Sequence, residues 1–197
     1  MTDSLTRCPW AQGSPDYQHY HDWEWGVPLR DERGLFEFLV LEGMQAGLSW
    51  LTVLRKREAL RRAFVGFDPE KVAGFTSRRI DRLLNDAAII RHRGKIEATV
   101  QNASLVLELR AGSKNFTELV WSFVGDRPIQ NRRERLADVP SSTPASQMMS
   151  KTLKRLGFRF VGPTICYAFM QATGMVNDHL VGCHRFEVCR QLGSTRG

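Results

Sequence analysis

The chain has 197 residues, of which 42% are hydrophobic and 25% charged, and this size and composition suit one globular domain with a sizeable core. Residues 1–10 lack the pattern of a secretory signal, and no apolar run is long enough to span a bilayer. We therefore expect a single cytoplasmic domain over residues 1–197, with no membrane partner. The formal charge of +7 and pI of about 9.6 favour polyanionic partners without identifying one.

Most segments repeat their apolar residues at helical spacing, and no long stretch shows the alternation of a half-buried strand, so the sequence predicts an all-α fold. Asp31 is expected to cap the first long helix, and Gly157 to end a later one. The predicted helices cover, in chain order, residues 32–43, 48–63, 69–72, 78–84, 94–109, 116–124, 145–156 and 163–173. The two ends, 1–28 and 175–197, are polar and aromatic and are expected to be irregular.

A glycine-bounded turn between two of these helices has the features of a phosphate-binding site. Gly157 ends one helix, an apolar stretch follows, and Gly162 and Pro163 begin the next. Glycine lets a backbone approach a phosphate, and the free amides at a helix start bind anions. Residues 150–173 thus resemble the helix-hairpin-helix element of DNA repair proteins, although an ordinary turn with a glycine stop has the same pattern. The residues expected to contact DNA are Lys154, Gly157, Arg159, Gly162 and Thr164.

Two pairs of potential metal ligands stand near opposite ends of the chain, at about 8–25 and 176–186. They are Cys8, His21, His179 and Cys183. Zinc prefers four such ligands in a tetrahedron, which leaves no position for water, so the sequence predicts one structural zinc ion that joins the termini. His184 and Cys189 are alternative ligands. The competing interpretation is that the cysteines are buried thiols and the histidines ordinary side chains.

Aromatic residues are concentrated in the N-terminal quarter of the chain. They include Trp10, Tyr17, Tyr20, Trp23, Trp25 and Trp50. Aromatic faces stack on a base that has left the duplex, and they attract it more strongly when it is positively charged. Glu42 follows an apolar helical segment, and a carboxylate in such surroundings is a candidate functional group. Taken singly, the aromatic residues are equally compatible with core packing, and Glu42 with a solvated position.

Seven short segments carry a more specific pattern. They are CPW at 8–10, YxxYHDxEWGVP at 17–28, LEGMQAGLSW at 41–50, IIRHRGKI at 89–96, VWSFV at 120–124, FVGPTICYAFMQA at 160–172 and VNDH at 176–179. In this order they closely resemble the bacterial DNA-3-methyladenine glycosylase I family. The resemblance extends from about Cys8 to Cys183 and implies a zinc-containing helix-hairpin-helix DNA glycosylase. The segment at 184–186 departs from the family, whose end is richer in cysteine.

Carried over to matching positions, the resemblance implies individual roles. The zinc ligands are Cys8, His21, His179 and Cys183; the polar edge of the base contacts Glu42 and Tyr20; and the aromatic walls are Trp10, Tyr17 and Trp50. Glu42 is the expected catalytic residue. The family lacks the aspartate that assists catalysis in related glycosylases, and no carboxylate stands between Gly162 and Asn177 here. Asp178 matches the run beside a zinc ligand rather than a catalytic position.

The implied reaction is excision of 3-methyladenine from double-stranded alkylated DNA, by a monomer that flips the lesion out of the duplex. Because the alkylated base is already cationic, its glycosidic bond is weak, and preferential binding of this base can account for much of the catalysis. The turn at 45–48 is a candidate wedge for the vacated space. A noncatalytic DNA-binding module and a zinc hydrolase are the competing functions, and activity on 3-methylguanine is left open.

Overall fold

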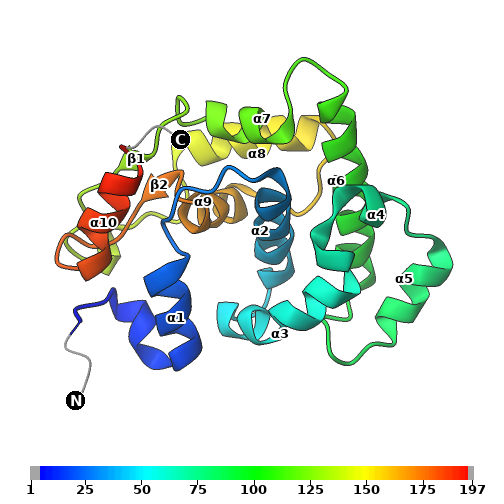
Figure 1. The fold of residues 1–197 in the computed structure, drawn as a ribbon, viewed down its shortest axis with the longest axis horizontal. Helices are drawn as coiled ribbons and strands as arrows, with labels where there is room; N and C mark the ends of the chain where they lie inside the picture. The colour runs from blue at the N-terminus through cyan, green and yellow to red at the C-terminus, as the bar shows by residue number, and fades with distance from the viewer. Residues whose placement is uncertain (1–4, 195–197) are drawn as a thin grey trace.

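A computed structural model describes residues 5–194 as a mostly helical chain (Figure 1), which confirms the predicted all-α fold. Its α-helices are α1 (Pro15–Trp23), α2 (Glu32–Gln45), α3 (Trp50–Ala63), α4 (Pro69–Ala73), α5 (Ser77–Leu84), α6 (Arg93–Arg110), α7 (Phe116–Ser122), α8 (Pro144–Arg155), α9 (Pro163–Ala172) and α10 (His184–Leu192). Short 3-10 helices lie at Pro9–Gly13, Val65–Phe67 and Leu136–Asp138. None of the described helices is long and apolar enough to cross a membrane.

Side-chain caps account for where the predicted helices begin. The Asp31 side chain accepts a hydrogen bond from the Gly34 amide and so starts α2 as predicted. The next long helix, α3, begins at Trp50 rather than at Leu48, because the Ser49 side chain accepts the amide of the first turn. Ser, Asp and Asn side chains satisfy amides that have no partner within the helix, so they define its first residue.

The expectation of irregular chain ends is wrong for residues 5–28 and 175–194, because each of these ranges contains a short helix. Residues 1–4 and 195–197 lie outside the described residues. α1 starts where the Ser14 side chain accepts the Tyr17 amide and a proline occupies the first helical position. α10 starts where the Cys183 sulfur accepts the Arg185 amide. Both helices are only nine residues long, shorter than the window over which apolar periodicity is recognised, so periodicity did not reveal them. Strands β1 (Ile129–Gln130) and β2 (Val176–Asn177) pair in parallel, and β2 contacts α10.

Helix α2 contacts α3, α6, α7, α9 and the 3-10 helix at Val65–Phe67 (Figure 1). Nine of its residues are buried, and they form an almost continuous run that includes Leu39, Leu41 and Met44. A helix that is apolar on every side belongs in the core. Glu42 stands in this run, so the fold buries a carboxyl group that is only 4% exposed.

The turn between α8 and α9 is held by hydrogen bonds from neighbouring helices. Gly157 closes α8 with a φ of +98°, a conformation that favours glycine. The Asn102 side chain on α6 accepts the Arg159 amide at 2.9 Å and donates to the Arg159 carbonyl at 3.1 Å. Ser150 donates to the Val161 carbonyl at 2.6 Å. The turn is therefore a fixed structure that presents the start of α9.

Gly174, between α9 and β2, is the glycine at which a side chain is least tolerable. Its φ is +66°, and a Cβ atom would lie 2.4 Å from backbone atoms of Val27 and Pro28. We expect Gly174→Ala to lower the free energy of unfolding by more than about 2 kcal/mol, because the backbone of Val27 and Pro28 must move. The melting temperature should fall with it. Gly13→Ala, where a Cβ meets no atom within 4 Å, is the matched control. Equal melting temperatures for the two variants would contradict this packing.

Candidate active site and metal cluster

A cavity of about 340 Å³ lies among the N-terminal segment, α2, α3 and α9. Its lining residues are Cys8, Trp10, Tyr17, Tyr20, Trp25, Glu42, Gln45, Trp50, Leu136, Val139, Ala168, Gln171, Asp178 and Leu180. All five residues that the sequence assigned to base binding are among them. Its size and its aromatic lining suit a planar organic ligand the size of a nucleobase.

The aromatic side chains of the cavity pack against one another. The Trp10 ring lies edge-on to Tyr17, with centroids 5.8 Å apart, and to Trp25, with centroids 5.1 Å apart. A second pair of rings, Tyr20 and Trp50, has centroids 5.4 Å apart. Edge-to-face contacts at these distances are favourable and hold the rings in place. The cavity walls are therefore preformed.

Glu42 supplies the buried carboxyl group of this cavity. It is 4% exposed, and burial raises its pKa to about 8, with no cation or hydrogen-bond donor among the described residues to offset the loss of water. Burial, followed by the nearby charge of Glu42, raises the pKa of Tyr20 well above its ordinary value. Glu42 is therefore mainly protonated at neutral pH, and Tyr20 remains a phenol.

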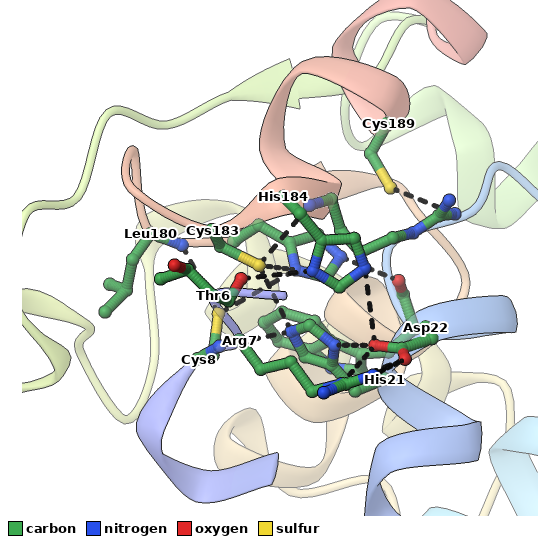
Figure 2. Close-up of polar contacts among 12 residues, drawn as sticks. Thr6, Arg7, Cys8, His21, Asp22, Leu180, Cys183, His184 and Cys189 are labelled. Carbon is green, nitrogen blue, oxygen red and sulfur yellow. Dashed lines mark hydrogen bonds and ion pairs between the residues drawn. The ribbon is translucent and has the colours of Figure 1, made fainter. Parts of the chain in front are cut away.

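The four ligand residues predicted from the two ends of the chain lie together beside the cavity (Figure 2). All four are buried, and their ligand atoms lie within 4.8 Å of one another. The Cys183 sulfur is 3.3 Å from His21 Nε2 and 3.6 Å from His179 Nδ1, and the Cys8 sulfur is 3.8 Å from the same Nδ1. Tetrahedral zinc separates a sulfur and a nitrogen ligand by about 3.5 Å. The cluster can therefore hold a metal ion.

The second nitrogen of each histidine is engaged in a way that leaves the first nitrogen available to a metal. His21 Nδ1 is 2.7 Å from a carboxylate oxygen of Asp22, which in turn accepts hydrogen bonds from Arg7. His179 Nε2 is 3.0 Å from the Trp25 carbonyl oxygen. Such outer contacts fix the tautomer and ring orientation of metal-binding histidines. Within the cluster, a hydrogen bond from Cys8 lowers the pKa of Cys183, which favours a thiolate ligand.

The alternative ligands lie outside the cluster (Figure 2). His184 Nδ1 is 3.0 Å from the Thr6 carbonyl oxygen, and Cys189 accepts a contact from Arg185 at 3.8 Å. Cys166 is also separate, with its sulfur directed at the Val161 carbonyl. The departure of residues 184–186 from the family pattern therefore leaves the cluster complete.

The residues assigned to DNA contact lie at the end of α8, in the turn that follows and at the start of α9. Lys154, Arg159 and Thr164 are exposed. The amides of Thr164 and Ile165 have no acceptor among the described residues. A Cβ atom placed on Gly162 would meet no atom within 4 Å, so the backbone is open to an approaching ligand. This arrangement is that of an anion site at a helix start.

Two polar residues of the cavity had no assigned role in the sequence. Gln171, on α9, and Asp178, after β2, both line the cavity, and Gln171 donates to Asp178 at 2.8 Å. Their positions in two of the family-like segments were a signal, but nothing in the spacing indicated that they face the same space. Gln45, which the sequence placed in the wedge turn, also lines the cavity.

Comparisons with known proteins identify the family and the fold. Residues 10–186 match the family model described as methyladenine glycosylase. The chain belongs to the methyladenine glycosylase family. This member is 52% identical to DNA-3-methyladenine glycosylase 1 of Escherichia coli, over 91% of this chain and 96% of that protein. It is 50% identical to DNA-3-methyladenine glycosylase of Haemophilus influenzae, over 90% and 96%.

Solved structures of the methyladenine glycosylase family have the same fold as this chain. A crystal structure of 3-methyladenine DNA glycosylase I matches with a TM-score of 0.89 and 51% identity, over 91% of this chain and 98% of that one. A variant of 3-methyladenine DNA glycosylase I in complex with 3-methyladenine matches with a TM-score of 0.88 and 37% identity, over 97% and 99%. The present cavity thus belongs to a fold with a known base-bound member.

The cluster of this glycosylase should bind one metal ion per chain. We expect Cys183→Ser to lose the ion and to melt at a lower temperature, because the metal joins segments far apart in sequence and binds only the folded chain. Metal analysis and thermal melts of both proteins measure this. Cys166→Ser changes a buried cysteine outside the cluster and should keep the ion. A wild-type protein that is metal-free and equally stable would contradict the metal site.

Proposed function

We propose that this chain removes 3-methyladenine from alkylated double-stranded DNA by hydrolysing its N-glycosidic bond, which leaves an abasic site. The observation that carries the proposal is the unpaired Glu42 carboxyl buried in an aromatic cavity. Two relatives that are at least 50% identical are named for this reaction. Since cavity and hairpin come from one chain, we propose that a monomer suffices.

The cavity suits a base that has left the duplex. Trp10, Tyr17 and Trp50 offer aromatic faces and edges to a planar ligand, and the attraction increases when the ligand carries positive charge. Glu42 and Tyr20 offer polar groups to the edge of the base. A module that only binds DNA has no need of such a cavity, which argues against the noncatalytic alternative.

Glu42 favours the alkylated base through charge. In the empty cavity its carboxyl is mainly neutral at pH 7, because burial raises its pKa to about 8. A cationic base brings the charge that stabilises the carboxylate, whereas neutral adenine brings none, gains less from the cavity and so keeps its stacking in the duplex. Glu42 therefore selects the lesion by differential binding.

The chemical step requires little acid catalysis. The electrons of the N-glycosidic bond move to the cationic base, which leaves as a neutral molecule, and the positive charge passes to the sugar. Water then adds at C1′ and loses a proton to solvent. Because the leaving group is activated by its own charge, the protein chiefly has to extrude the base and hold it in place.

The turn between α8 and α9 is the proposed helix-hairpin-helix contact with the DNA backbone. Amides at the start of α9, near Gly162 and Thr164, would bind phosphate, with Lys154 and Arg159 adding positive charge and Gly157 shaping the turn. The turn at 45–48 is the proposed wedge, because Gln45 lines the cavity while Leu48 is 42% exposed. These contacts bind DNA without reading its sequence.

The metal that best fits the cluster is zinc, in a structural role. Two sulfur and two nitrogen ligands form a complete tetrahedral set, and all four are buried. When bound, zinc joins the N-terminal segment to the loop before α10. An ion with four protein ligands has no open coordination position for water and cannot activate it, which argues against the zinc hydrolase alternative.

Replacement of Glu42 tests the charge argument. We expect Glu42→Gln to reduce release of 3-methyladenine by about tenfold to a hundredfold, at or below the low end of acid–base effects, because the leaving group is already activated. Trp50→Ala should act in the same direction by removing a stacking surface. Release is measured from methylated DNA, with Glu108→Gln, an exposed glutamate, as control. Wild-type release and unchanged discrimination against adenine in Glu42→Gln would refute selection by charge.

Replacement of Gly162 tests the hairpin. We expect Gly162→Val to weaken binding to an abasic-site duplex, because the new side chain fills the space before the α9 amides while the backbone φ of −62° tolerates it. Wild-type affinity should fall steeply as salt rises. Gly182→Val, where a Cβ also meets no atom within 4 Å, is the matched control. Salt-independent affinity, or normal binding by Gly162→Val, would contradict the phosphate contact.

A further inference from the structure

Asp178 is a buried carboxyl beside the cavity that the proposed function leaves unused. It is 2% exposed, follows β2 and lines the cavity. One of its oxygens accepts hydrogen bonds from the Tyr167 hydroxyl and from Nε2 of Gln171, the latter at 2.8 Å. The other oxygen accepts from Nδ2 of Asn131 at 2.7 Å. Both oxygens are thus occupied by donors from the protein itself, so Asp178 is not free to contact a base.

The consequence of these contacts falls on Gln171. A carboxylate offers acceptors only, so the Gln171 amide has to turn its NH₂ group toward Asp178. Nε of Arg133 lies 3.9 Å from the Asp178 oxygen that accepts from Asn131. The amide oxygen of Gln171 then points away from Asp178, and no donor among the described residues bonds to it. Since Gln171 lines the cavity, this oxygen is available to a ligand there.

We propose that Asp178 fixes Gln171 as a hydrogen-bond acceptor that selects purines with an amino group, rather than an oxo group, at C6. This inference rests on the proposed function. Gln171 is the specificity-determining residue, and Asp178 is a positioning residue that acts through it. In the proposed reaction these two residues favour N3-alkylated adenine over N3-alkylated guanine.

The chemistry of the two purines explains the choice. The amino group of adenine donates hydrogen bonds, and it has two N–H groups, so Glu42 and Gln171 can each receive one. Guanine carries an oxygen acceptor at the same position. A guanine oxygen that faces the Gln171 oxygen leaves both of these acceptors without a donor, and such a mismatch is more costly than a lost contact.

The test is the ratio of single-turnover excision rates for 3-methyladenine and 3-methylguanine in matched duplexes. We expect the ratio to fall about tenfold in Gln171→Met, which has a similar size but no acceptor. Asp178→Asn should also lower it, because the new amide lets Gln171 present NH₂ to the cavity, which favours the oxo base. Differences in the intrinsic lability of the two bonds cancel when variants are compared with the wild type.

Tyr167→Phe is the matched control, since it removes a donor to Asp178 without releasing the Gln171 amide. A purely structural role for the network would lower both rates in proportion and leave the ratio unchanged in every variant. An unchanged ratio in Gln171→Met, with 3-methyladenine still released, overturns this inference alone, and it does so even if Asp178→Asn does not fold. A wild type that releases neither base refutes the proposed function itself.

Discussion

The burial of the Glu42 carboxyl without a partner is the constraint around which the site is organised. An uncompensated buried carboxyl is costly and normally responds by retaining its proton. Here the cost arises because α2 is enclosed on several sides and Glu42 stands in its apolar run. A ligand that brings positive charge to the cavity relieves this cost. The site thus favours cationic ligands through charge, independently of their shape.

The metal cluster borders the same cavity. Cys8 both belongs to the cluster and lines the cavity, and Trp25 both lines the cavity and accepts a contact from the ring of His179. Tyr20 and Trp25 also pack in the hydrophobic core, so the core and the cluster together hold the aromatic side chains of the N-terminal segment. A metal bound beside the cavity can therefore contribute to the shape of the site.

Local features of the fold were predictable from the sequence. Asp31, Gly157 and Pro163 each act within one turn of chain, so their effect on helix ends can be recognised without tertiary information. The four metal ligands were recognisable as residue types, and the choice of them over His184 and Cys189 agrees with the folded arrangement.

Other features depended on tertiary contacts and could not be predicted. Helices α1 and α10 are held by packing and by the cluster rather than by an apolar stripe, so they were expected as irregular segments. The link between Gln171 and Asp178 joins a helix to a strand end, and only the fold brings both to the cavity. Sequence reasoning had considered Asp178 only as a neighbour of a metal ligand.

The most direct test of this account is a carbon-13 NMR titration of the Glu42 carboxyl. In the free protein the account predicts a pKa of about 8, and with 3-methyladenine bound it predicts a carboxylate at neutral pH, because the bound base can carry the proton. Adenine, which is less basic, should leave the titration nearly unchanged. A Glu42 that titrates near the ordinary value of 4.5 in the free protein, or that keeps its proton when 3-methyladenine binds, would contradict the account.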